Sequence, residues 1–311
     1  MVQNKVYLYR CPDYSPGRLR RLVSDIFQDA GLNFSGSKVL LKPNLLAPNR
    51  PEQATTTHPA IVEAVIQVVK GGGGIPSLGD VPAWGDTFKA AAESGIAEVC
   101  RRYDVPVFSF SGYKKVSILG KGRFSHLRVA RQLDQFPIIL NLAKLKVHSQ
   151  LGLTMAVKNM FGCVLYPQRF LAHFVPIDLE TFSRMLVGVY LATRPTFSLL
   201  DGILVMETKG PRGGDPRELG ALLGGANPVA VDRVAGELVK MPFDLISTLV
   251  AARDMNVPGW DLSEIEIIGD LEELQIDDFK FPERAPVNFT LYRSLKMFIR
   301  MFIYPGDHFR N

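Results

Sequence analysis

The chain has 311 residues, 47% hydrophobic and 22% charged, which is ordinary globular composition and enough for one large α/β domain or two lobes. Its formal net charge of +5 favours anionic partners, but this is far from the footprint of a nucleic-acid-binding protein unless the charge is clustered. We therefore expect no nucleic-acid partner.

Predicted strands and helices alternate along the first part of the chain. Clusters of β-branched and aromatic residues indicate strands, and apolar residues spaced three and four positions apart indicate helices. The predicted strands lie at 5–10, 37–46 and 75–81, and the predicted helices at 15–30 and 59–70. Four glycines at 71–74 follow a helix and precede a strand, the reverse of the order in a phosphate-binding loop, so we interpret them as a helix stop and a turn.

The rest of the chain is richer in strands and continues the alternation. Strands are predicted at 105–110, 114–119, 125–130, 136–146 and 196–207, helices at 151–162 and 178–193, a loop at 210–220, and a strand, turn and helix at 221–241. The pattern predicts an α/β fold: a Rossmann-like, mixed but largely parallel sheet with helices on both faces. We expect one such domain over 1–280, built as a single body or as two lobes.

Residues 281–311 differ from the rest, because bulky apolar residues alternate there with Arg293, Lys296, Arg300 and Arg310. Two interpretations stay open for this C-terminal tail. It is either a helix that packs against its own domain, or a basic amphipathic segment that binds a membrane surface or a partner.

Cysteine usage and the absence of targeting patterns suggest the compartment. Cys11, Cys100 and Cys163 lie far apart without any CxxC pair, which argues against a disulfide framework and against a self-contained zinc or iron–sulfur site. The first residues show no signal-peptide pattern, and no apolar run reaches the ~18 residues of a membrane span. We expect a cytoplasmic protein without a metal-ligand set.

The first candidate site follows the strands of the amino-terminal half. Lys42 and Asn44 stand where an apolar strand gives way to a loop, and Asp80 stands at the end of the next strand. In open α/β sheets ligands bind beyond the carboxyl ends of strands, and a lysine there can hold a phosphate or a carboxylate. Thr57 precedes the helix at 59–70, where it either caps the helix or helps its first turn to bind an anion.

The second candidate site is NLAKLKVHSQLGLTMAVKNMFG, which leaves a buried strand for a predicted helix. On a strand, side chains two positions apart share a face, so Lys144, Lys146 and His148 point the same way. Several basic groups on one face of a buried strand are costly without an anion or acidic partners. If the next helix folds back, Lys158 and Asn159 join the same crevice.

The third candidate site is LLDGILVMETKGPRGG, which carries Asp201 inside a strand and Glu207 at its end. These carboxylates can pair with the lysines, bind a metal, or act as general acid or base. The glycine-rich loop that follows can close over a ligand. No motif of a known reaction accompanies these residues.

Six segments of the chain occur in an order that resembles the domain-of-unknown-function family 362. They are LLKPNLL, TTTHPAIVEAV, GDVPAW, NLAKLKVHSQLGLTMAVKNMFGC, LLDGILVMETKGPRGG and NPVAVDRVAGEL, within residues 38–240. Many members of that family carry a ferredoxin-like segment with two CxxCxxC motifs, so the resemblance implies an iron–sulfur association. This chain lacks that segment. The family is also similar in fold to the amino-terminal domain of lactate racemase-like proteins, which implies a lysine and histidine cofactor site at Lys146, His148, Lys158 and His173.

We predict that the chain is an enzyme acting on a small anionic ligand, bearing phosphate or carboxylate, in a crevice lined by Lys and His. Its cofactor is not predicted. The predicted catalytic residues are Lys146, His148 and Asp201, and the predicted ligand-binding residues are Lys42, Asn44, Thr57, Asp80, Lys158, Asn159 and Glu207. Two alternatives are a redox accessory protein working with a ferredoxin-type iron–sulfur partner, and a non-catalytic binding module.

Overall fold

A computed structural model of the chain describes residues 4–118, 125–165, 168 and 178–283. The elements of its first half follow the predicted alternation closely. They are β1 (Lys5–Arg10), α1 (Pro16–Asp29), β2 (Lys38–Pro43), the 3-10 turn η1 (Pro51–Gln53), α2 (Pro59–Gly71), β3 (Ile75–Asp80), α3 (Thr87–Glu93), α4 (Ile96–Arg102), β4 (Val107–Ser109), β5 (Tyr113–Ser117), β6 (His126–Ala130) and η3 (Arg131–Gln135).

The second half contains the longest strands, which form the centre of the fold. Its elements are β7 (Ile138–His148), β8 (Gly152–Thr154), α5 (Ala156–Asn159), η4 (Met160–Cys163), α7 (Leu179–Thr193), β9 (Phe197–Glu207), β10 (Asp215–Gly225), α8 (Pro228–Leu238), η5 (Phe243–Leu245), α9 (Ser247–Asp254), η6 (Leu262–Glu264), β11 (Glu266–Ile268) and α10 (Leu271–Leu274).

One mixed sheet of nine strands organises the described chain, in the order β11-β1-β10-β9-β7-β2-β3-β4, with β8 paired to β7. The five strands from β9 to β4 run parallel, whereas β10 is antiparallel to both β9 and β1. The expected α/β fold with a largely parallel sheet is therefore confirmed. β5 and β6 form a separate antiparallel pair.

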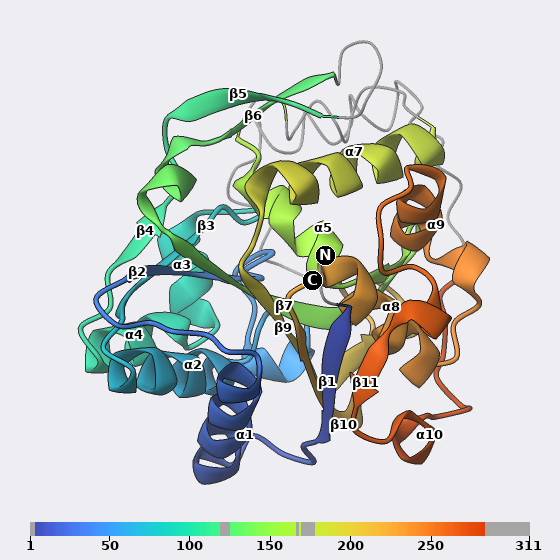
Figure 1. Ribbon diagram of the computed structural model, residues 1–311, viewed down its shortest axis with the longest axis horizontal. Coiled ribbons are helices and arrows are strands. Elements are labelled where there is room, and N and C mark those ends of the chain that lie inside the picture. Colours follow the sequence, from blue (N-terminus) through green and yellow to red (C-terminus); the bar gives the residue numbers. More distant parts are fainter. Residues whose placement is uncertain (1–3, 119–124, 166–167, 169–177, 284–311) are drawn as a thin grey trace.

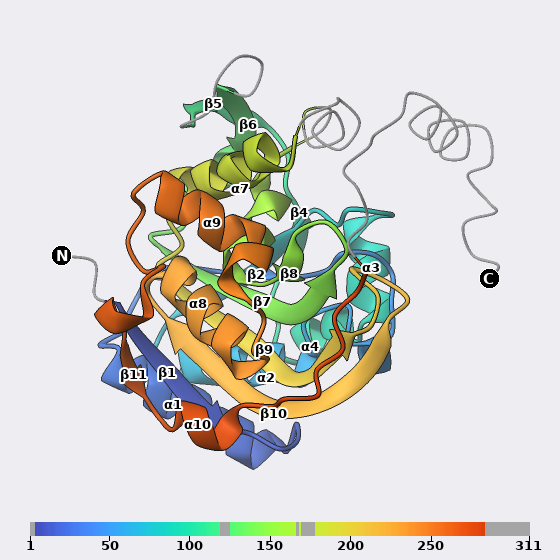
Figure 2. The ribbon, with the colours of Figure 1, turned by 90° about the vertical axis from the view of Figure 1, so that its right-hand side faces the viewer.

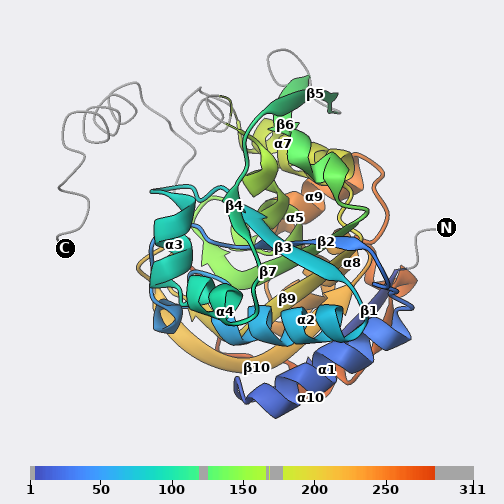
Figure 3. The ribbon, with the colours of Figure 1, turned by 90° about the vertical axis from the view of Figure 1, so that its left-hand side faces the viewer.

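Helices cover both faces of the sheet (Figure 1). On one face α1, α2 and α4 bury an apolar core that includes Ile26, Val65 and Leu142. On the other face α8 and α9 pack over a second core that includes Leu145 and Val234. Because both faces are covered, the central strand β7 is buried along nearly its whole length, as parallel strands usually are; Figure 3 shows it between the two helical layers.

The parallel strands β2, β3, β7 and β9 point towards the same end of the sheet, which brings polar residues of neighbouring strands together. Lys42 pairs in register with Asn141 of β7, and Lys144 pairs with Asp201 of β9. Polar residues placed far apart in the sequence therefore meet at the carboxyl ends of the strands, where open α/β sheets bind ligands.

Three local expectations were wrong. Residues 151–162 do not form one helix, because Gly152 adopts a φ of +80° and β8 turns back on β7 as a hairpin before the short α5. A side chain at Gly152 has no room, since its Cβ would lie 2.2 Å from the Leu245 carbonyl oxygen. The loop expected at 210–220 ends at Asp215, where β10 begins against β9. The first turn of α2 is capped by the His58 side chain, not by Thr57.

Of the helices in the described ranges, none has both the length and the apolar character that a membrane-spanning helix needs. The tail at 284–311 and His173 lie outside the described residues.

Candidate functional site

A buried ion pair stands at the ends of β2 and β3. The Lys42 ammonium lies 2.8 Å from an Asp80 carboxylate oxygen, and both side chains are almost completely buried. The same ammonium donates hydrogen bonds to the Pro43 carbonyl at 2.8 Å and to Asn159 Oδ1 at 3.3 Å. Gly162 makes this packing feasible, since a Cβ there would lie 2.4 Å from Asp80 Oδ1 and 2.8 Å from Lys42 Nζ.

Asn44 links this ion pair to a second lysine. Its Nδ2 donates to Asn159 Oδ1 at 3.0 Å, and its Oδ1 accepts from Lys146 Nζ at 3.0 Å. The Lys146 ammonium also donates to the main-chain carbonyl of Thr55. The residues Asp80, Lys42, Asn159, Asn44, Lys146 and Thr55 thus form one continuous polar network, which we call the edge network.

Lys146 is the unusual member of the edge network, because its side chain is fully buried and the acceptors of its hydrogen bonds are neutral. Within the described residues, no ion pair includes it. Burial is the main cause that lowers the pKa of Lys146 well below the usual value, and the positive charges of Lys158, Lys144 and Lys42 lower it further. This lysine therefore lies in a positive, desolvated environment.

The segment between η1 and α2 carries three buried threonines, Thr55, Thr56 and Thr57. The Thr57 hydroxyl accepts from the Asn44 amide and donates to the Leu142 carbonyl, each at 2.8 Å, which fastens this segment to β2 and β7. The hydroxyls of Thr55 and Thr56 are buried and find no hydrogen-bond partner within the part of the chain that the structure describes. Unsatisfied buried hydroxyls are costly, so these two are candidate donors to a ligand.

A second buried cluster lies beside the edge network. Lys144 Nζ lies 2.7 Å from Asp201 Oδ2, and the Tyr14 hydroxyl donates to Asp201 Oδ1 at 2.9 Å. The ring of His58 stacks on Tyr14 with centroids 3.5 Å apart, and its main-chain amide donates to Asp201 at 3.0 Å. Burial lowers the pKa of His58 to about 4 and raises that of Tyr14, so both rings are neutral at neutral pH.

The remaining predicted site residues lie at the border of these clusters. His148 Nδ1 accepts from the amides of Gln150 and Leu151, an arrangement that supports the turn between β7 and β8. Glu207 accepts from the amide of Lys280, which ties the C-terminal segment to the end of β9. Lys158 is half-buried and contributes positive charge to the surroundings of Lys146.

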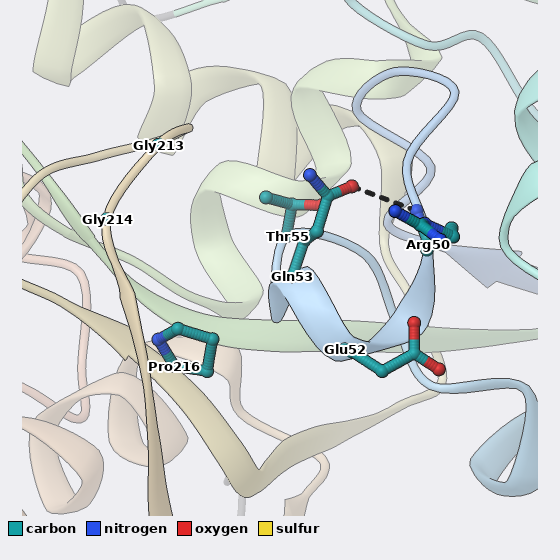
Figure 4. Close-up of a pocket in the computed structure, with 7 residues that line it drawn as sticks. All are labelled: Arg50, Glu52, Gln53, Thr55, Gly213, Gly214 and Pro216. Atoms are coloured by element: carbon teal, nitrogen blue, oxygen red, sulfur yellow. Dashed lines mark hydrogen bonds between the residues drawn. The ribbon is translucent and has the colours of Figure 1, made fainter.

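A pocket of about 410 Å³ opens next to the edge network. One wall is the segment after β2, with Arg50, Glu52, Gln53 and Thr55. The other is formed by Gly213 and Gly214 of the loop after β9 and by Pro216 at the start of β10 (Figure 4). Thr55 belongs to both the pocket and the edge network, because it lines the pocket and its carbonyl accepts the hydrogen bond from Lys146. Thr55 therefore connects the wall of the pocket to the Lys146 ammonium.

Sequence reasoning missed several members of these clusters. Tyr14 follows β1 in a loop without any motif, and it reaches Asp201 only through the fold. Thr55 and Thr56 had a visible signal in the run of three threonines, of which only Thr57 was selected. Asp232 is buried and accepts the amides of Ala156 and Val157, so it serves α5.

Metal-binding groups are not gathered in this site. Over residues 4–118, 125–165, 168 and 178–283, no three His, Cys, Asp or Glu side chains are placed to share a metal ion. Cys11, Cys100 and Cys163 are all buried free thiols, and burial raises the pKa of Cys11 to about 11, which keeps it protonated.

The chain is similar to one described family and to proteins of other organisms. Residues 39–237 match the family described as Domain of unknown function, DUF362. A thylakoid-associated protein of Synechocystis sp. is 34% identical over 303 residues, which cover 96% of this chain and 94% of that protein. The lactate racemase apoprotein of Thermoanaerobacterium thermosaccharolyticum aligns over 73% of this chain with a TM-score of 0.45 and 11% identity, and the alignment covers only 55% of the racemase chain.

Proposed function

This chain belongs to the DUF362 family, and we propose that it binds a small anion, bearing a phosphate or a carboxylate group, against Lys146 at the pocket beside the edge network. The observation that carries the proposal is the state of Lys146. Its ammonium is fully buried, its hydrogen-bond acceptors are neutral, and the nearby charges that act on it most strongly are those of other lysines.

The charge balance of the site supports an anionic ligand. Asp80 is committed to Lys42 and Asp201 to Lys144, at 2.8 and 2.7 Å, so each of these pairs is neutral as a whole. Lys146 then adds positive charge that these two carboxylates do not balance, and no ion pair of the described residues includes it. An ammonium in a low-dielectric site costs several kcal/mol unless an opposite charge accompanies it, and a bound anion supplies that charge.

The donors around the pocket suit oxygen atoms of an anion. The buried hydroxyls of Thr55 and Thr56 find no hydrogen-bond partner among the described residues, and the Arg50 side chain belongs to the pocket wall that Thr55 lines, together with Glu52. A volume of about 410 Å³ lies within the usual range of small-molecule sites, roughly 300–1,000 Å³. Binding requires the Thr55 segment to shift so that the ligand reaches the ammonium.

Lys146 also supports the proposed enzymatic role. A lysine whose pKa is held well below its usual value by burial can take a proton from a bound ligand and return it, which is general acid–base chemistry. Asp201 and His148, the other two predicted catalytic residues, hold Lys144 and the β7–β8 turn, so we assign them to positioning. Binding of the anion is thus the primary proposal, and proton transfer by Lys146 is its extension.

A thermal unfolding experiment with inorganic phosphate tests the proposal. A ligand at a hundred times its Kd stabilises the folded state by about 2.7 kcal/mol, so phosphate is expected to raise the unfolding midpoint of the wild-type protein. Lys146→Met should remove this response. Lys38→Met serves as the matched control, since Lys38 lies at the exposed start of β2, and it should respond like the wild type. Equal responses in all three proteins would refute the assignment of Lys146.

A further inference from the structure

Thr154, the last residue of β8, carries a buried hydroxyl that forms no hydrogen bond with the described part of the chain. The residue is 1% exposed, and its Oγ1 neither donates to nor accepts from any other residue between 4 and 283 that the structure describes. A buried hydroxyl without a hydrogen bond costs free energy, because it has lost its water. Valine has nearly the same shape and would fill this position without that cost. The hydroxyl at position 154 therefore needs a role other than packing.

Thr154 lies beside Lys146 on the same face of the sheet. The two residues are directly paired in the antiparallel ladder of β7 and β8, and Figure 2 shows β8 beside the end of β7. Side chains of such a pair share a face, with Cβ atoms roughly 4.5–5.5 Å apart. The next pair, Val147 and Leu153, belongs to the core under α8 and α9. Because side chains alternate along a strand, Lys146 and Thr154 point away from that core, to the other face.

Thr154 also stands on the side of β7 that faces the edge network. A strand has two hydrogen-bonding sides, and β9 occupies one of them, since it pairs with β7 as far as Lys146. β8 therefore pairs with the other side, which β2 occupies as far as Leu142. The chain leaves β2 there for Asn44, which accepts a hydrogen bond from Lys146. β8 thus takes the place of β2 in the sheet just beyond the residues that hold the ammonium.

The hairpin of β7 and β8 is attached to the loop that lines the pocket. In the turn of the hairpin, the amide of Ser149 donates to the Gly210 carbonyl at 3.2 Å. Gly210 packs tightly on β7 here, since a Cβ at this position would overlap the Val147 carbonyl. The same loop continues to the two glycines of the pocket wall. One wall of the pocket is therefore fastened to the hairpin that carries both the lysine and the threonine.

We propose that Thr154 is an anion-binding residue, whose hydroxyl donates a hydrogen bond to the ligand oxygen that Lys146 binds. This inference rests on the proposed function and adds a second residue to the same site. An ammonium has three N–H donors, of which two go to Asn44 and to the Thr55 carbonyl, so one is left for a ligand. The hydroxyl supplies a neutral donor next to it, and a phosphate or carboxylate oxygen has lone pairs for both. Because paired strands hold the two donors in place, the ligand meets them with little reorganisation.

Removal of the hydroxyl alone tests this role. Thr154→Val should raise the Kd for inorganic phosphate at least about tenfold in isothermal titration calorimetry, because hydrogen bonds to charged groups are stronger than neutral ones. Thr154→Ser keeps the hydroxyl and should retain most of the affinity. Without phosphate, Thr154→Val should unfold at the same temperature as the wild type or at a higher one, since it removes an unsatisfied polar group. A purely structural hydroxyl would give the opposite result.

Thr196→Val is the matched control. Thr196 lies just before β9, at the amino end of the strands, and its hydroxyl accepts the Ile139 amide at 3.0 Å. This variant should unfold at a lower temperature and bind phosphate like the wild type. An unchanged Kd in Thr154→Val, or a lower unfolding temperature of Thr154→Val without phosphate, would overturn the role of Thr154 and leave the assignment of Lys146 untouched. A wild-type protein that binds no phosphate would instead refute the proposed function, and this inference with it.

Discussion

Replacing Lys146 by methionine should change the free energy of unfolding in a way that depends on pH. Methionine has nearly the shape of the lysine stem, so it fills the same buried space without the ammonium. Two effects on the free energy of unfolding oppose each other. The acceptors on Asn44 and Thr55 lose their donor, which costs about 1–3 kcal/mol each, whereas the desolvation of the ammonium disappears.

The pH dependence separates the two effects, because only the second involves a proton. Burial holds the pKa of Lys146 well below 10.5 in the folded state, whereas an unfolded lysine titrates near its usual value. Between these two pKa values the unfolded chain binds a proton that the folded chain does not. The wild type is therefore destabilised as the pH falls through this window, by at most about 1.4 kcal/mol per pH unit, and the penalty stays complete below the folded pKa.

Urea unfolding of wild type and variant over about pH 7 to pH 10 measures the difference directly. Lys146→Met should gain stability relative to the wild type as the pH falls, while the exposed control Lys38→Met should follow the wild type at all pH values. Saturating phosphate should flatten the difference, because a bound anion favours the charged ammonium. A difference that stays constant with pH would show that the folded protein keeps Lys146 charged and compensated, and the argument for an anion site would fail.

Three further predictions concern the packing and charge around this site. Gly162→Ala should destabilise the fold by about 1–3 kcal/mol, because the new Cβ has no room. Gly17→Ala is the control, since there is open space around Gly17, and it should not destabilise the fold. Equal midpoints of urea unfolding for the two variants would contradict the described packing. Asp201→Asn should lower the free energy of unfolding by about 3–5 kcal/mol, because it leaves Lys144 without its carboxylate. The double variant with Lys144→Met and Asp201→Leu should recover most of this loss. A double variant as unstable as the single one would argue against the pair. His58 should titrate in NMR near pH 4, and its contribution to stability should be lost as the pH falls from about 6.5 to about 4; a midpoint near 6.5 would show that the ring is not buried as described.

The sequence predicted that the candidate residues stand at the carboxyl ends of the strands, because this depends on local patterns. Lys42 and Asp80 follow apolar runs of strand type, and the ends of parallel strands meet at one edge. Lys146 and Asn159 could be assigned to the same edge once the chain was expected to turn back after β7. The prediction failed only in how it turns, since apolar spacing alone does not distinguish a helix from a short hairpin followed by a helical turn.

The pairing of charges could not be predicted, because it depends on strand order and register. Lys144 and Asp201 are 57 positions apart and become partners only because β7 and β9 are neighbours in the sheet. Tyr14 joins them from the far end of the chain. Composition shows how many lysines and carboxylates exist, but only the register decides which lysine is left without a carboxylate.

The strongest physical argument for a ligand is that Lys146 has no carboxylate partner among the described residues. Asp80 and Asp201 could each have neutralised a lysine anywhere along this edge, yet both are held within 2.8 Å of a lysine other than Lys146. If position 146 served stability alone, an apolar residue would be expected there. Replacing buried charges by apolar residues of similar volume is often neutral or stabilising. The cost of burying Lys146 is therefore best explained if a bound anion offsets the charge of its protonated form, while the strands hold the side chain in position.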